Sequence, residues 1–145
     1  MILTKLVYDQ LLNCSKVPPE IGGILGSRDK IVNKVIFDKG ISTANDCVYI
    51  PNVYQLNQLI LQWSKMKITF SGMFHTHADQ WSAFSMDDIR YIRTILISMP
   101  ATINELYFPI VFPGRMIKSY IARRKGKDVD IIEDSILVEG DERLR

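Results

Sequence analysis

Two histidines, His75 and His77, stand one residue apart and are the only histidines in the chain. Ser85 follows His77 after a gap of seven residues, and Asp88 lies three positions beyond that serine. Histidine is the commonest metal-binding side chain, and residues i and i+2 of an extended strand point to the same face. Both imidazoles would therefore converge, and a carboxylate from the next element would complete three protein ligands. Three ligands leave a fourth tetrahedral position for water, as in catalytic zinc sites.

Each of these residues also has a structural interpretation. A single histidine on an apolar strand is more often a satisfied core residue than a ligand. Ser85 and Asp88 match a helix capping box, which is compatible with metal binding because a capped helix start also fixes its first-turn carboxylate. Asp87 is the competing ligand, and the spacing favours Asp88. Glu20, before the Gly22-Gly23 pair, would by itself be interpreted as a solvated acid at a strand entrance.

The elements that must position these residues are predicted from hydrophobic periodicity and turn residues. Helices are expected over Leu3–Cys14, Val53–Lys65 and Met86–Ser98. Strands are expected over Ile21–Leu25, Lys30–Phe37, Cys47–Ile50, Ile68–His77, Glu105–Phe112, Met116–Ala122 and Val129–Val138, with a hairpin about Pro113-Gly114-Arg115. This order predicts an α/β (α+β) fold in which a mixed β-sheet is packed between α-helices.

Composition limits the class of protein. With 145 residues, 47% of them hydrophobic and 23% charged, the chain is expected to form one globular domain over residues 1–145. Residues 140–145 are expected to be a frayed, charged terminus. The net charge of +2 argues against a dedicated nucleic-acid binder, and Arg123–Lys127 is interpreted as a solvated hairpin tip.

Cysteine usage and hydropathy bear on localisation. No apolar run reaches the length of roughly 18 residues that a membrane span needs, so no membrane association is expected. Cys14 and Cys47 have no CxxC partner, which favours a reduced, cytoplasmic protein.

The residues singled out above are Glu20, His75-Thr76-His77, Ser85 and Asp88. Together they resemble the signature of the JAMM (MPN-domain, or Mov34-type) metalloproteases, which is an upstream Glu followed by His-Ser/Thr-His, seven residues, Ser, two residues and Asp. The spacing matches without insertion or deletion, and the chain looks most like the compact, free-standing prokaryotic members. The resemblance implies an MPN/JAB-like fold with cytidine-deaminase-like layering. Ala78 and Phe84 replace prolines of many relatives, and neither is expected to touch a ligand.

The resemblance also implies a chemistry. One zinc ion per chain would be held by His75, His77 and Asp88, while Glu20 would act as general base and Ser85 would donate to the oxyanion. Family members hydrolyse isopeptide or peptide bonds at the C-terminus of ubiquitin or ubiquitin-like proteins, including sulfur-carrier proteins.

Three alternatives remain beside that activity. The protein could release a small adduct from a sulfur-carrier protein, or it could be an inactive MPN scaffold, although every motif position is filled. A zinc nucleobase deaminase is disfavoured because its His-x-Glu and Pro-Cys-x-x-Cys signature is absent.

Gly22, Gly23 and Gly26 would either leave room for a substrate backbone or serve as turn and bulge glycines.

Overall fold

The computed structural model describes residues 1–14, 20–41, 49–77 and 83–140. Within these ranges the helices are α1 (Lys5–Leu12), α2 (Val53–Lys65) and α3 (Met86–Ser98). The strands are β1 (Ile2–Thr4), β2 (Gly22–Arg28), β3 (Ile31–Asp38), β4 (Thr69–Thr76), β5 (Glu105–Tyr107), β6 (Ile110–Phe112), β7 (Met116–Lys125), β8 (Asp128–Asp134) and β9 (Leu137–Glu139). None of these helices has the length and hydropathy needed to cross a bilayer.

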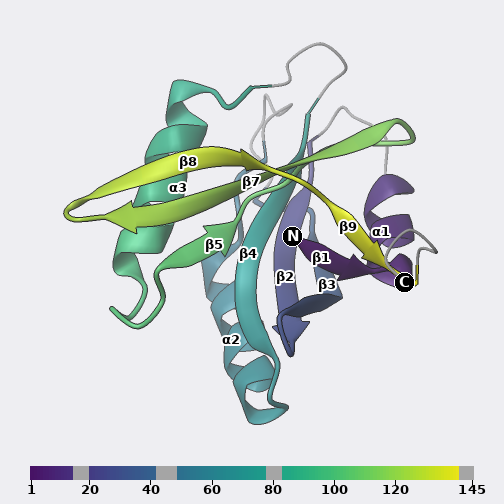
Figure 1. Cartoon of the computed structure of the whole chain (residues 1–145), viewed down its shortest axis with the longest axis horizontal. Coiled ribbons are helices and arrows are strands. Elements are labelled where there is room, and N and C mark those ends of the chain that lie inside the picture. Colours follow the sequence, from purple (N-terminus) through teal and green to yellow (C-terminus); the bar gives the residue numbers. More distant parts are fainter. Residues whose placement is uncertain (15–19, 42–48, 78–82, 141–145) are drawn as a thin grey trace.

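The strands form one mixed sheet in the order β5-β7-β6-β4-β2-β3-β1-β9, and β8 pairs with β7 (Figure 1). At its centre β2 lies antiparallel to both β3 and β4. On its other side β4 runs parallel to β5 and β6. The predicted fold class, a mixed sheet with helices against it, is confirmed.

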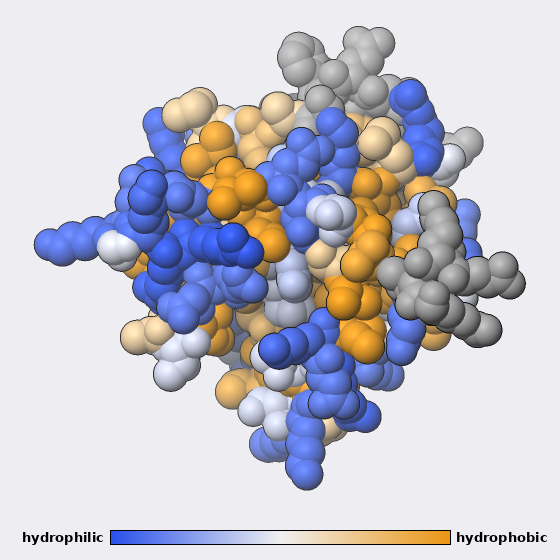
Figure 2. Space-filling view, in the orientation of Figure 1, coloured by the Kyte–Doolittle hydropathy of each residue, from blue (hydrophilic) through white to orange (hydrophobic). Residues whose placement is uncertain are grey.

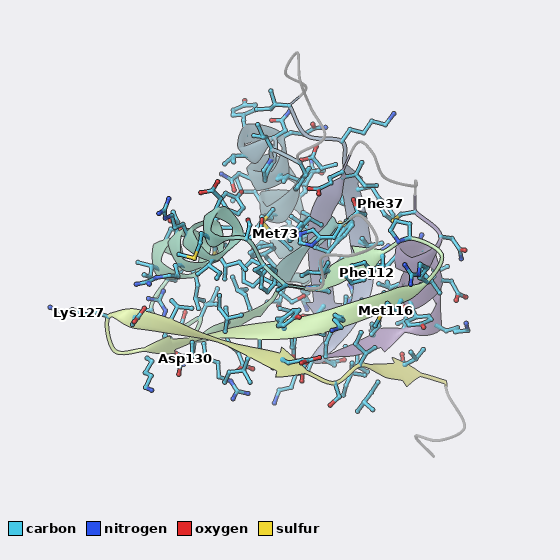
Figure 3. The ribbon with its side chains drawn as sticks, turned by 90° about the horizontal axis from the view of Figure 1, so that it is seen from above. Phe37, Met73, Phe112, Met116, Lys127 and Asp130 are labelled. Atoms are coloured by element: carbon cyan, nitrogen blue, oxygen red, sulfur yellow. The ribbon has the colours of Figure 1, made fainter. Side chains whose placement is uncertain are left out.

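Alternate residues of the central strands point to opposite faces of the sheet. Ile24 and Met73 pack in one core cluster with the buried side chains of α2 and α3. Their neighbours Leu25 and Phe74 pack in a second cluster with those of α1. Figure 3 shows Met73 on the side of the central strands that faces α3. Both faces of β4 are therefore buried, as its nearly continuous apolar sequence predicts.

Helices α2 and α3 have the predicted bounds, and a capping side chain marks the start of each. The side chain of Asn52 accepts a hydrogen bond from the Gln55 N–H and so caps α2. In α2 the buried Leu56 and Trp63 lie seven residues apart, on the face that contacts the sheet. Ser85 caps α3 in the same way.

The first predicted helix begins later than expected. Residues Ile2–Thr4 form β1, which runs parallel to β3 and to β9. The Thr4 hydroxyl then accepts a hydrogen bond from the Val7 N–H, so the helix starts at Lys5. Leu3 and Val7 have helical spacing, but Leu3 is part of β1 because Ile2–Thr4 pair with the distant strands β3 and β9 instead of extending the helix.

Two predicted strands are each divided in two. Glu105–Phe112 is interrupted at Phe108-Pro109, and its halves β5 and β6 both lie between β4 and β7. Val129–Val138 is interrupted after Asp134, where the chain leaves β7 and joins β1 as β9. Of the strand predicted over Cys47–Ile50, Tyr49 and Ile50 are outside any strand, and the rest lies outside the described residues. The predicted frayed tail also lies outside them, apart from Gly140.

The basic hairpin between β7 and β8 is partly structural. The Arg124 guanidinium donates hydrogen bonds to the carbonyls of Leu96, Met99 and Ile103, at 2.8, 2.7 and 2.9 Å. These carbonyls belong to the C-terminal end of α3 and the residues after it, where backbone oxygens lack helical partners. The interpretation as a solvated tip is therefore wrong for Arg124. It holds for Lys127, which projects from the tip (Figure 3), in a region whose surface is hydrophilic (Figure 2).

Replacing Arg124 by Met tests this docking. We expect Arg124→Met to lower the free energy of unfolding by about 3 kcal/mol. Each hydrogen bond from a charged donor contributes roughly 1.5–3 kcal/mol, and water molecules that bind the exposed carbonyls in the variant recover part of the loss. Chemical denaturation measures the change. The matched control Lys127→Met should stay within about 0.5 kcal/mol of the parent. Equal effects of the two substitutions would contradict the proposed role of Arg124.

Candidate metal centre

Strand β4 brings the two histidines to one place. His75 is in β4 and is paired with Gly22 of β2 and with Ile110 of β6. His77 follows the last strand residue, Thr76, and its N–H donates to the Val111 carbonyl at 3.0 Å. The regular strand thus ends one residue before the predicted end, but extended pairing continues. His75 and His77 consequently point to the same side, toward the start of α3.

The ligand atoms of three side chains converge there. The Nε2 atoms of His75 and His77 are 2.7 Å apart. Asp88 places Oδ2 at 3.6 Å from Nε2 of His75 and at 3.5 Å from Nε2 of His77. Among the described residues these three form a group that could hold a metal ion, with all ligand atoms within 4.8 Å of one another.

The three distances fit a tetrahedral metal. Zinc bonds of roughly 2.0–2.1 Å place donor atoms about 3.3 Å apart. Both distances to Asp88 are near this value, whereas the two imidazole nitrogens are closer and must separate by about half an ångström. Asp87 is excluded from the group, because its side chain is 93% exposed and faces Arg90 at 3.5 Å. The structure therefore brings His75, His77 and Asp88 together and leaves Asp87 outside.

Asp88 is held by the helix cap. Its N–H donates to the Ser85 hydroxyl oxygen at 3.1 Å, and the Ser85 N–H donates back to Oδ2 at 2.9 Å. Oδ2 is also the oxygen that faces both imidazoles, so one atom belongs to the capping box and to the candidate site. The Ser85 hydroxyl acts as an acceptor in this cap, which leaves its proton available to another acceptor.

Electrostatics keep the Asp88 carboxylate ionised. Burial by itself would raise its pKa, but contacts with His75 and then His77, and the hydrogen bond from the Ser85 backbone, outweigh burial. The pKa of Asp88 is thus held well below its usual range. A metal ion could bind this carboxylate at neutral pH without displacing a proton.

Glu20 is placed beside this group through Thr76. The buried Thr76 hydroxyl accepts a hydrogen bond from the Ile21 N–H at 2.9 Å and donates to the Ile21 carbonyl at 3.3 Å. The Thr76 N–H also donates to that carbonyl, at 2.8 Å. Glu20 therefore precedes a residue fixed to the middle of the His-Thr-His motif, and it lines the same cavity as His75 and Asp88.

Sequence reasoning gave Thr76 no role of its own. The signal that could have found it is its place between the two histidines, where the resembling signature allows only Ser or Thr. A hydroxyl there binds the backbone of Ile21, the residue before β2, which an aliphatic side chain could not do.

Phe84 differs from its expected behaviour. Its ring centroid lies 6.0 Å from that of His75 and 4.7 Å from that of Tyr120. The expectation that this substitution touches no ligand is wrong, because such distances are those of aromatic packing. Phe84 thus restricts the orientation of the His75 ring. Ala78 lies outside the described residues.

Other residues of this chain occupy the space beside Gly22 and Gly23 of β2. A Cβ on Gly22 would overlap the Tyr49 ring, and one on Gly23 would overlap the Ile36 carbonyl. The room expected for a substrate backbone at these two positions is therefore occupied. Gly26 lies where the register of β2 shifts, which matches the alternative interpretation as a bulge glycine.

Comparison with known proteins supports the fold. No protein-family profile matches the sequence, and no curated protein matches it significantly. A solved structure of a protein from Desulfitobacterium hafniense has a TM-score of 0.64 and 20% identity, covering 96% of this chain and 93% of that chain. A protein from Salinibacter ruber has a TM-score of 0.56 and 13% identity, covering 98% and 94%. A JAB1/MPN domain protein from Archaeoglobus fulgidus has a TM-score of 0.51 and 15% identity, covering 95% and 98%.

These likenesses concern the fold. The chain shares the MPN-like arrangement with the Archaeoglobus fulgidus protein over nearly the whole length of both chains. The fold predicted from the resemblance is thus confirmed at this distant level. A His-His-Asp group lies within that fold at the point where β4 ends and α3 begins.

Metal analysis tests the group. The purified protein should bind about one zinc per chain. His75→Ala, His77→Ala and Asp88→Asn should each reduce the zinc content sharply, since each removes a ligand atom. Asp87→Asn is the matched control and should keep the parent content. Full zinc retention in a His75→Ala/His77→Ala protein would rule the site out.

Proposed function

We propose that this protein is a zinc metallopeptidase that hydrolyses isopeptide or peptide bonds at the C-terminus of a ubiquitin-like protein. The observation that carries the proposal is the convergence of His75, His77 and Asp88 on one point beside Glu20. The MPN-like fold supports it as an analogy. The free thiol of Cys14 fits a reducing compartment such as the cytoplasm.

The residues of the site have complementary roles in this proposal. Bound zinc would polarise the scissile carbonyl and lower the pKa of a coordinated water molecule. Glu20 would accept the proton of the attacking water and deliver it to the departing amine, while the carbon–nitrogen bond breaks. The Ser85 hydroxyl, whose proton the cap does not use, would donate to the developing oxyanion.

The shape of the site favours a tail as substrate. The cavity at the metal ligands has a volume of about 260 Å³, which is below the roughly 300–1,000 Å³ typical of sites that enclose a drug-sized ligand. A folded domain cannot enter it, whereas an extended C-terminal tail can reach the ligands while its domain stays outside. A sulfur-carrier protein with a small adduct has the same kind of tail and is the second candidate substrate.

An inactive scaffold is the alternative from another functional class. Loss of catalysis usually removes a ligand or the general base, and here both kinds of residue are present and close together. We therefore favour an enzyme.

Substitution of Glu20 tests the general base. In zinc-loaded protein, Glu20→Gln keeps the size and hydrogen bonding of the side chain but cannot accept a proton, so turnover should fall by roughly 10²-fold or more. Turnover is followed by intact mass on ubiquitin-like fusions that carry different C-terminal adducts. Zinc content should be unchanged. The control Glu133→Gln, at an exposed position of β8, should retain parent activity. A fully active Glu20→Gln protein would disprove the role of Glu20 as general base.

Ser85 has two roles that substitutions can separate. As a helix cap alone, Ser85→Ala should cost about 1 kcal/mol of stability and leave the rate nearly intact. As an oxyanion donor it should also lower the rate by about 10²-fold. Ser85→Asn keeps a good cap but places a bulkier amide at the oxyanion position, so we expect a stable and nearly inactive protein. A Ser85→Asn protein with the parent rate would limit Ser85 to capping.

A further inference from the structure

An apolar cavity opens directly beside the candidate metal ligands. Its charged lining residues are Glu20, Asp87 and Asp88, and His75 also borders it. The rest of the lining described by the structure is apolar or aromatic and includes Tyr49, Ile50, Met73, Tyr91, Ile92 and Phe108. Water in such a space finds few hydrogen-bond partners, so an apolar group that displaces it gains free energy.

One wall of the cavity is fixed by the glycine opposite His75. Because Gly22 has no side chain, the Tyr49 ring can lie against β2 next to the histidine. The Tyr49 hydroxyl donates to Asp38 at 2.8 Å. Burial, and then the hydrogen bond to Asp38, raise the pKa of Tyr49 far above its usual value, so the hydroxyl stays a neutral donor.

Asp38 holds this wall from behind. It is only 9% exposed, and its carboxylate also accepts from the backbone N–H groups of Gly40 and Asn52, at 2.9 and 3.0 Å. These bonds hold Gly40 and Asn52 close to the Tyr49 hydroxyl around one carboxylate. The wall of the cavity that Tyr49 forms is therefore fixed by hydrogen bonds.

The apolar space also has depth. A second cavity of about 150 Å³ lies between α2 and α3 and shares Met73 and Tyr91 with the first. Met73 and Tyr91 therefore lie between the two cavities. The first cavity, with a volume of about 260 Å³, has room for a long or aromatic side chain by itself.

We propose that the first cavity binds a large apolar side chain of the group that the reaction releases. This rests on the proposed function, with a substrate tail that ends in Gly-Gly and therefore carries no side chain on the acyl side next to the scissile bond. When the scissile carbonyl lies at the metal ligands, only the substrate residues next to the scissile bond are within reach of the cavity. Because the acyl side has no side chain there, the side chain that fills the cavity comes from the amine side. The enzyme then selects its leaving group by size and hydropathy.

Hydroxamates test the cavity without catalysis. In zinc-loaded protein we expect 3-phenylpropanohydroxamate to bind at least tenfold more tightly than acetohydroxamate, because each buried CH₂ increases affinity roughly fourfold. Calorimetry gives both affinities. Ile50→Glu should abolish the difference, since Ile50 is 41% exposed and can accept a charge without disrupting the core. Leu61→Glu, at an exposed position of α2 away from the cavity, is the matched control and should preserve it.

A peptide series then tests the direction. Substrates ending in Gly-Gly-Leu or Gly-Gly-Phe should be cleaved after the second glycine with a kcat/KM at least tenfold above those ending in Gly-Gly-Gly or Gly-Gly-Asp. Equal affinities of the two hydroxamates would overturn the cavity proposal and leave the peptidase proposal intact. A preference for apolar residues only on the acyl side would overturn the leaving-group assignment. A protein that binds no zinc would instead refute the proposed function itself.

Discussion

The antiparallel pairing of β2 with β4 at the centre of the sheet determines which way the two histidines point and where Glu20 lies. It sets Gly22 opposite His75 and Gly23 opposite Phe74. A slip of one residue would turn His75 and His77 toward α1 and carry Phe74 to the other face. Two kinds of contact resist such a slip. Thr76 is bonded in both directions to Ile21, and the Phe74 ring packs where Gly23 has no side chain.

The same pairing explains why a ligand group and a cavity lie side by side. Successive residues on one face of β4 are Met73 and His75, so a buried apolar side chain stands next to a metal ligand. On β2 the corresponding positions are Gly22 and Ile24. Gly22 leaves space for the Tyr49 ring, and Ile24 packs in the hydrophobic core next to it. The metal-ligand group and the apolar cavity thus lie next to each other because Met73 and His75 are successive residues on the same face of β4.

Local signals made much of this predictable. The bounds of α2 and α3 follow from capping residues and buried positions within each helix, and the His-Thr-His motif with Ser85 and Asp88 spans only fourteen residues. Such features depend on neighbours in the sequence. The prediction also distinguished Asp88 from Asp87 by spacing alone, and the geometry places only Asp88 against the imidazoles.

Contacts between distant residues were not predictable in the same way. The parallel pairing of β1 with β9 joins the first and last described strands, and no local pattern encodes it. The packing of the Tyr49 ring against Gly22 is a contact between residues that are far apart in the sequence, with β3 between them. Phe84 was considered only as a replaced proline, because its contact with His75 requires the path of the chain between them.

The docking of Arg124 has a mechanical consequence for the opposite end of α3. The helix has 13 residues; at 1.5 Å per residue it is a rod about 20 Å long, so a tilt of about 5° at one end moves the other by nearly 2 Å. Metal sites tolerate errors of about 0.2 Å in ligand distance. The Arg124 guanidinium, which binds the carbonyls of Leu96 and Met99 at the C-terminal end of α3, therefore opposes such a tilt from the end of the helix opposite Asp88.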